Sequence, residues 1–262
     1  MQLQFASKRI LIRDIYSSPS GPSITTYWLS LNEKDFFGQF YFGLKHNFKK
    51  IYQNSNFYEK KISKTFDNNF QYKPSPYLLS SIIKYQNKKY RIEDFAVESI
   101  WQNKIGAKDY EKLNNFFWFF SLDLKSSKET TQSVIKNWVN KNDKYNKDSW
   151  EFDLTAKRII AWLSNHQLSY QDSDKEYRLM FDHMIQKQAN HLLSEIGSSN
   201  TLENKLIGCS AIILTGLAYK NEKNYLESGL GILKNIIKSS IDNQGFTKSR
   251  NIKQLIFYLK YF

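Results

Sequence analysis

The stretch 205-KLIGCSAIILTGLAYK-220 decides the fold class of this chain, because it is uncharged between its two lysines and apolar on two sides. Two apolar stripes run along it at helical spacing: Leu206, Ile213 and Leu217, and beside them Ile207, Ala211, Leu214 and Ala218. A helix that is apolar on two sides is buried between neighbouring helices. About 14 residues are too few to cross a bilayer. The stretch therefore predicts a helix buried between its neighbours and no membrane span.

The same spacing of three and four between apolar residues recurs along the chain and predicts further helices. It covers the ranges 35–54, 110–124, 134–138, 154–163, 181–196 and 226–237. Short links such as 220–224 join antiparallel neighbours. With 4 Pro and 10 Gly, the chain lacks the turn residues of a many-stranded fold. We predict a mainly α fold of antiparallel helical hairpins, with one small β-hairpin at residues 82–92.

A polar connection suggests two domains. Residues 54–76 hold Asn68-Asn69 and end in Pro74-Ser-Pro76, a pattern typical of a long loop. We expect an N-terminal extension of helix and loop over residues 1–76 and a helical domain over residues 77–262. At 251–262 a fresh helical pattern begins whose apolar face has no later partner in the chain. We therefore expect the helical domain to belong to a longer protein.

Composition limits the classes of function. The 262 residues hold 38 Lys+Arg against 25 Asp+Glu, a net charge of +13, which suits either a solvated lysine surface or a polyanion partner. The single Cys209 excludes a disulfide framework and a Cys-based zinc site. The four histidines lie at no metal-ligand spacing, and the GxSxG, GxxxxGK[ST] and GxGxxG motifs do not occur. We expect no metal and no cofactor.

The N-terminal residues show no secretory leader, because the apolar run 10–12 is broken at once by Arg13 and Asp14. The cytoplasm is the default location on this evidence, and the periplasm is a second option.

Two groups of side chains are candidates for chemistry on residue type alone. Phe116–Phe120 holds five consecutive aromatic residues, which either fill space between helices or present a flat platform to a sugar ring. His166, His183 and His191 belong to the one residue type that titrates near neutrality. No acidic partner lies at a fixed spacing from any of them, so structural or surface roles are favoured for all three.

Three separated blocks share a family pattern. The first is Ser99-Ile-Trp101 followed by 114-NNFFWF-119, and the second is 150-WEFDLTAKRIIAW-162. The third runs from Gly197 through Asn200 and the buried stretch to 245-GFTKSRN-251. Together they span roughly residues 90–262 and resemble the N-terminal half of the bacterial heparinase II/III-like polysaccharide lyases. The resemblance implies an α/α toroid, an incomplete barrel of antiparallel helical hairpins.

This resemblance also implies a reaction, a substrate and site residues. Members of the family cleave acidic, uronate-containing polysaccharides such as glycosaminoglycan or alginate by β-elimination, in which a base takes the C5 proton and an acid protonates the leaving oxygen. Asn200 falls on the family asparagine that contacts the uronate carboxylate. Arg250, Ser249, Arg158 and Trp118 fall on the matching blocks and are expected to bind substrate. For Arg158, a structural role between helices stays equally open.

Departures from the family pattern keep other functions open. The histidine that follows the family asparagine is Thr201 here, and the positions of the Tyr-His pair hold Ile252 and Lys253. The base and the acid are therefore not identified, and the C-terminal β-sandwich half of the family is missing from this sequence. The alternative is a non-catalytic helical module that binds acidic glycan or a protein partner. Nucleic-acid binding ranks below both, because lysines and glutamates are interspersed and no nucleic-acid motif occurs. The oligomeric state is left open.

Overall fold

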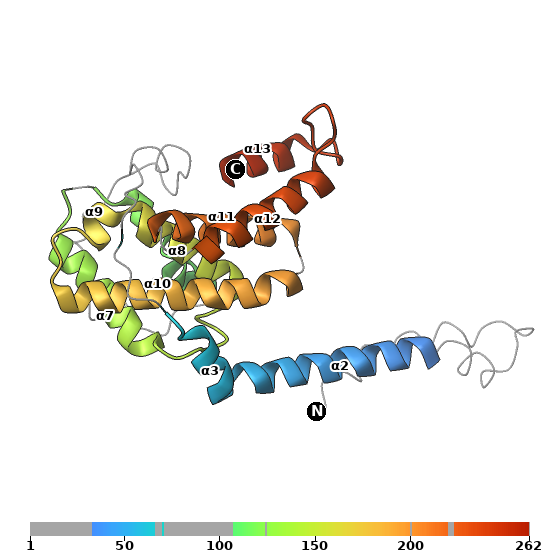
Figure 1. Ribbon diagram of the computed structural model, residues 1–262, viewed down its shortest axis with the longest axis horizontal. Helices are drawn as coiled ribbons and strands as arrows, with labels where there is room; N and C mark the ends of the chain where they lie inside the picture. Colours follow the sequence, from blue (N-terminus) through green and yellow to red (C-terminus); the bar gives the residue numbers. More distant parts are fainter. Residues whose placement is uncertain are drawn as a thin grey trace, which may run out of the picture. The chain divides into compact units, whose positions relative to one another are not determined.

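The computed structural model describes residues 33–65, 70, 107–123, 125–199, 201–219 and 223–261. The chain divides into two compact units, Met1–Tyr52 and Gln53–Phe262, and each is described by itself. The described residues are mainly helical (Figure 1), which confirms the predicted fold class. The β-hairpin expected at 82–92 lies outside the described residues.

The described part of the first unit is the long helix α2 (Glu33–Gln53), which lies where the apolar spacing over residues 35–54 predicts it. Its last turn is basic, and its C-terminal half exposes several large apolar side chains.

The second unit contains the remaining described helices. In chain order they are α3 (Asn56–Ile62), α6 (Ala107–Asn114), the 3₁₀ helix η2 (Phe117–Ser121), α7 (Lys128–Asn142), α8 (Phe152–Ser164), α9 (His166–Ser169), α10 (Lys175–Glu195), the 3₁₀ turn η3 (Ile196–Ser198), α11 (Leu202–Ala218), α12 (Lys223–Ser240) and α13 (Ile252–Tyr261). Ile241 and Thr247 form an isolated antiparallel β-bridge.

Helix α11 is buried among other helices of the second unit, as its two apolar stripes predict. It packs against α8, α10, α12 and α13 (Figure 1). Leu206 and Ile207, which head the two stripes, are both buried. Within the described part of the chain, no helix is both long enough and apolar enough to cross a membrane.

Helices α11 and α12 approach each other closely because glycine lies at their contact. A Cβ atom on Gly216 would lie 2.5 Å from the main-chain nitrogen of Leu226, and one on Gly229 would lie 2.5 Å from Cγ1 of Ile213. The Cys209 thiol donates to the main-chain oxygen of Gly229 at 3.1 Å across the same contact. Helices α11 and α12 are therefore tightly packed against each other.

The helix expected over residues 110–124 is interrupted, which corrects the single apolar stripe predicted there. Helix α6 ends at Asn114, and Phe116 adopts a left-handed backbone with φ of 57° before η2 begins. The side-chain oxygen of Asn115 accepts a hydrogen bond from the Phe117 amide at 2.9 Å. Because an asparagine side chain can replace a main-chain partner in this way, the Asn114-Asn115 pair favours a turn over a continuous helix.

Candidate anion-binding site

The structure places Arg158 inside the core of the second unit, on α8, with no exposed surface. Its guanidinium carbon lies 3.9 Å from the centre of the Trp138 ring. It donates to four groups: the main-chain oxygens of Asn114 and Ser149 at 2.9 and 3.0 Å, Oε1 of Gln188 at 2.7 Å and Oγ1 of Thr155 at 3.2 Å. No carboxylate of the described residues forms an ion pair with it. Burial lowers the pKa of Arg158 to about 9, which leaves the guanidinium charged at neutral pH.

Arg158 therefore joins the end of α6, the loop after α7, α8 and α10 by hydrogen bonds to neutral oxygens. A buried arginine that satisfies its donors in this way fixes the relative positions of the surrounding elements. In this conformation its guanidinium is closed to solvent and out of reach of a polysaccharide.

Trp118 lies at the edge of the same core. Its indole N–H donates to the main-chain oxygen of Leu113 at 3.3 Å, and its ring stacks on Phe116 with the centroids 5.8 Å apart. The Phe116 ring in turn packs edge-on against Trp138, beneath Arg158. The other aromatic residues of the run are buried: Phe116, Phe117, Phe119 and Phe120. The run fills space between helices, and only the half-buried Trp118 reaches its boundary.

A compact turn after α12 holds the other predicted residues. The main chain reverses through the Ile241–Thr247 bridge. One oxygen of Asp242, Oδ1, accepts hydrogen bonds from the amides of Gln244 and Phe246 at 2.9 and 3.0 Å. Gly245 takes φ of 83°, which glycine adopts without strain. The DNQG sequence thus builds the turn around the Asp242 carboxylate.

Arg250 and Ser249 lie at the end of this turn, where α13 begins. Arg250 has φ of 54° and its Nη2 lies 2.8 Å from Oδ2 of Asp242. Its guanidinium also lies 5.7 Å from the Phe246 ring centre. The Ser249 hydroxyl donates to the Gln254 side chain in the first turn of α13. Arg250 is therefore oriented by one carboxylate and one ring while most of its side chain stays in solvent.

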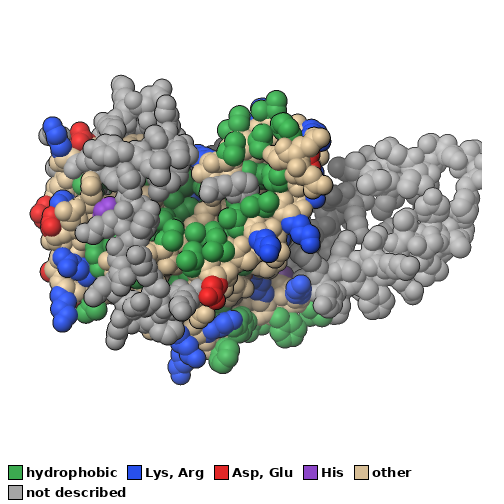
Figure 2. All heavy atoms as spheres, turned by 45° about the horizontal axis from the view of Figure 1, so that its top comes forward, with side chains coloured by type: hydrophobic (Ala, Val, Ile, Leu, Met, Phe, Trp, Pro, Cys, Tyr) green, Lys and Arg blue, Asp and Glu red, His purple; other side chains and the backbone are tan. Residues whose placement is uncertain are grey.

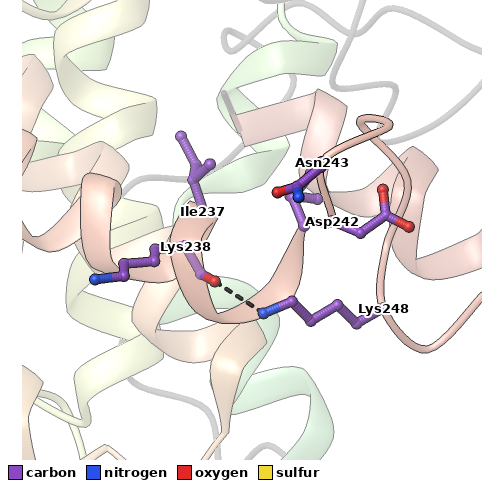
Figure 3. Close-up of a pocket in the computed structure, with 6 residues that line it drawn as sticks. Ile237, Lys238, Asp242, Asn243 and Lys248 are labelled. Atoms are coloured by element: carbon purple, nitrogen blue, oxygen red, sulfur yellow. Dashed lines mark hydrogen bonds between the residues drawn. The ribbon is translucent and has the colours of Figure 1, made fainter.

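A pocket of about 440 Å³ opens between the end of α12 and this turn (Figure 3). It is lined by Ile237, Lys238, Ile241, Asp242, Asn243 and Lys248. The Lys248 ammonium donates to the main-chain oxygen of Lys238 at 2.9 Å, whereas the Lys238 ammonium points away from it (Figure 3). The Asp242 carboxylate turns away from both ammonium groups and toward the loop (Figure 3). The pocket thus combines an apolar wall with two separately directed cations.

Electrostatics favour an anion at this pocket. Hydrogen bonds from main-chain amides, first that of Phe246, lower the pKa of Asp242, so its carboxylate is ionised and its Oδ2 is paired with Arg250. Lys238 and Lys248 are both exposed and add positive charge beside this neutralised pair. A carboxylate or sulfate can bind either ammonium group, and the apolar face of a sugar ring can cover Ile237. The sequence pointed to this turn but not to the two lysines, since lysine is common along the whole chain and Lys and Arg side chains are spread over the face drawn in Figure 2.

Asn200, the predicted carboxylate contact, lies outside the described residues. Its neighbour Thr201 is the N-cap of α11, and its hydroxyl oxygen accepts a hydrogen bond from the Asn204 amide at 3.1 Å. Thr201 therefore acts as a capping residue in the position where the family has histidine. Ile252 and Lys253 occupy the first turn of α13, and both are exposed.

The three histidines of the second unit contact polar or aromatic partners within the fold. Nδ1 of His191 lies 2.7 Å from the hydroxyl of the buried Tyr58, and Nδ1 of His183 lies 2.8 Å from the Thr65 hydroxyl. The His166 ring packs against Phe70 at 5.9 Å. His166 and His191 are buried, which agrees with the structural roles favoured for them. Burial lowers the pKa of His183.

Sequence reasoning missed a buried acid between α9, α10 and α11. Asp182 accepts hydrogen bonds from the hydroxyls of Tyr219 at 2.7 Å and Tyr170 at 3.0 Å. Burial raises the pKa of Asp182 to about 6, although both tyrosines oppose the rise. Nothing in the spacing of these residues distinguishes this aspartate from exposed ones.

The arrangement does not bring all the predicted residues together. Arg158 and Trp118 share the aromatic core, whereas Arg250 and Ser249 lie on the turn after α12. No group of His, Cys, Asp and Glu in the described ranges is placed to hold a metal ion. Protein-family models, curated proteins and solved structures were each compared with the chain, and none of them matches it.

Proposed function

We propose that this chain binds an acidic, uronate-containing polysaccharide at the pocket between α12 and the turn that follows it. The observation that carries the proposal is a pocket of about 440 Å³ whose lining has an apolar wall and two exposed lysines, Lys238 and Lys248, with separately directed side chains. A uronate residue has the matching chemistry, because its carboxylate is anionic and one face of its ring is apolar. The net charge of +13 would raise the local concentration of such a polymer.

Arg250 extends this site along the turn. Its guanidinium is oriented by Asp242 and Phe246, and a planar guanidinium with free N–H groups binds carboxylate or sulfate in a bidentate manner. A polymer presents such groups at every sugar, so cations at the pocket and at Arg250 would contact neighbouring units of one chain.

Binding measurements with matched polymers test the proposal. Alginate and a heparan-type polymer should bind, and neutral dextran should not. The double change Lys238→Gln and Lys248→Gln should weaken binding by about tenfold, a loss typical of one or two charged contacts. The control pair, Lys141→Gln and Lys147→Gln, removes the same charge from exposed positions elsewhere. Equal losses in the two pairs would mean that net charge, and not this pocket, holds the polymer.

Cleavage by β-elimination is the second candidate, and the three family-like blocks favour it. The residues that line the pocket in the described structure include no Tyr or His to serve as the usual base and acid, so binding ranks first. Ultraviolet absorbance of the unsaturated product, followed with each polymer that binds, tests for turnover. Asn200→Ala should abolish that turnover because the uronate carboxylate would lose its amide donor; full activity in this variant would remove Asn200 from the proposal.

We also propose the α/α toroid as the finer arrangement of the helical hairpins. The close packing of α11 against α12 and against α8 supports successive hairpins. An experimentally determined structure of the whole chain tests it, with hairpins expected to follow one another around an axis; a stacked bundle without that rotation would contradict it.

A further inference from the structure

Helix α2 exposes a continuous apolar stripe at one face. The fractional exposure of Leu44 is 41%, that of Phe48 is 68% and that of Ile51 is 67%. These residues are four and three positions apart, so they lie along one face of the helix. In the sequence the same spacing continues toward the N-terminus with Phe40 and Phe36.

Lysines flank this stripe. Lys45 and Lys50 are exposed, and Lys49 lies between them on the same helix. At roughly 100° per residue, the three lysines lie about 90–130° from the middle of the apolar stripe, on its two sides. No Asp or Glu occurs in the sequence between Asp35 and Glu59, so this part of the helix carries positive charge alone.

We propose that α2 lies on an anionic lipid surface, with its apolar stripe in the acyl boundary and its lysines at the headgroups. Aromatic and aliphatic side chains on one face with lysines beside them are the features of helices that bind in the plane of a bilayer interface. The helix does not cross the membrane in this arrangement, in keeping with its lysine content and with the lack of a spanning helix among the described residues.

The charge distinguishes this partner from a second copy of the chain. Two copies that met through this stripe would bring the lysines of one helix toward the same lysines of the other, with no acidic residue in residues 36–58 to offset them. An anionic bilayer supplies the opposite charge and an apolar phase together. Each lysine near such a surface adds about fivefold to the binding constant at physiological ionic strength.

A fluorescent probe on the full chain tests the orientation of α2. The sequence has a single cysteine, Cys209, which is buried, so an introduced Phe48→Cys can be labelled selectively with an environment-sensitive dye. Vesicles of phosphatidylcholine with phosphatidylglycerol should shift its emission to the blue, and pure phosphatidylcholine should not. The matched control, His46→Cys, lies on the opposite face and should show little shift. Equal shifts at both positions, or no shift at either, would overturn the proposal.

Vesicle flotation measures how much the apolar stripe and the lysines each contribute to lipid binding. Phe48→Glu should reduce the bound fraction at least about tenfold, because it puts a charge into the apolar stripe. Leu259→Glu, a control at the similarly exposed Leu259 of α13, should bind as the unaltered chain does. Lys45→Gln with Lys50→Gln should weaken binding by about 25-fold, which follows from about fivefold per lysine. Equal binding to neutral and anionic vesicles would contradict the role of the lysines.

Two further measurements separate this surface from other roles. Soluble acidic polysaccharide should leave the dye at position 48 unshifted even when it binds the chain, so failure of either proposal leaves the other standing. Sedimentation equilibrium should show that the unaltered chain does not associate with itself through the apolar stripe, so Phe48→Glu should leave its apparent mass unchanged. If such association appeared without vesicle binding, the stripe would be a contact between copies and the lipid proposal would be wrong.

Discussion

Arg158 and Arg250 are the same residue type in two opposite settings. Arg158 has no exposed surface, and its guanidinium donates to neutral oxygens and lies over the Trp138 ring. The side chain of Arg250 is 61% exposed and is paired with the carboxylate of Asp242. The usual expectation, a buried charge beside its counter-ion and a free charge in solvent, is reversed.

The difference shows what each arginine can do. The interior arginine uses many short hydrogen bonds to hold four chain segments together, and its charge is stabilised by main-chain dipoles and a π face. The surface arginine contacts Asp242 and the Phe246 ring, and its exposed side chain offers N–H groups to a ligand. Hydrogen-bonding capacity, and not charge alone, therefore decides which of the two serves the fold and which can serve binding.

The largest expected effect comes from replacing the buried arginine, Arg158. Arg158→Met should lower the free energy of unfolding by about 3–5 kcal/mol, because it leaves several buried oxygens without donors. Chemical denaturation followed by far-ultraviolet circular dichroism measures the change. Arg158→Lys keeps the charge but loses the fork of donors; if it restored full stability, charge and not geometry would be the function of Arg158.

A second prediction concerns the close packing of α11 against α12. Gly216→Ala should cost about 2–3 kcal/mol, since the new Cβ would lie 2.5 Å from a main-chain nitrogen of α12. Gly231→Ala on α12 meets nothing within 4 Å and should be neutral or slightly stabilising. Thermal denaturation of the two variants compares them, and equal losses would contradict the close approach of α11 and α12.

A third prediction concerns the buried Asp182, whose contribution to stability depends on pH. The pKa of Asp182 is about 6 in the folded chain, above its ordinary value of 3.8, so its protonated form stabilises the fold. That stability is complete below about pH 4 and is lost as the pH rises through about 6, by roughly 1–3 kcal/mol. Asp182→Asn should remove this pH dependence. Unfolding free energies at pH 4, 5, 6 and 7 measure it, and an unchanged profile would show that Asp182 is not its source.

The smallest expected effect on stability comes from replacing the exposed arginine, Arg250. Arg250→Ala should change the free energy of unfolding by less than about 0.5 kcal/mol, because its ion pair is exposed to solvent. The same variant should weaken polysaccharide binding. A large loss of stability would mean that Arg250 holds the turn together as Arg158 holds the core.

The sequence predicted the helices best where one periodic pattern is long. The two stripes around Leu206 and Ile207 predicted the buried helix α11, and the spacing over 35–54 predicted α2. The interruption after Asn114 was missed because aromatic residues continue the helical spacing while the asparagine side chains compete for the main chain.

The candidate site was predicted only in part, since its contacts depend on distant residues. The turn around Arg250 is local, so its residues could be recognised from one block of sequence. Arg158 binds main-chain oxygens, whose positions no residue type reveals.

Cys209 can report the local separation of α11 from α12. Burial raises the pKa of its thiol to about 12, and the thiol donates to Gly229 across the contact of α11 with α12. A thiolate is the species that reacts with disulfide reagents, so modification requires the two helices to separate first. The rate at which such a reagent modifies Cys209 in the native chain therefore reports the local separation of α11 from α12, without any substitution in the sequence.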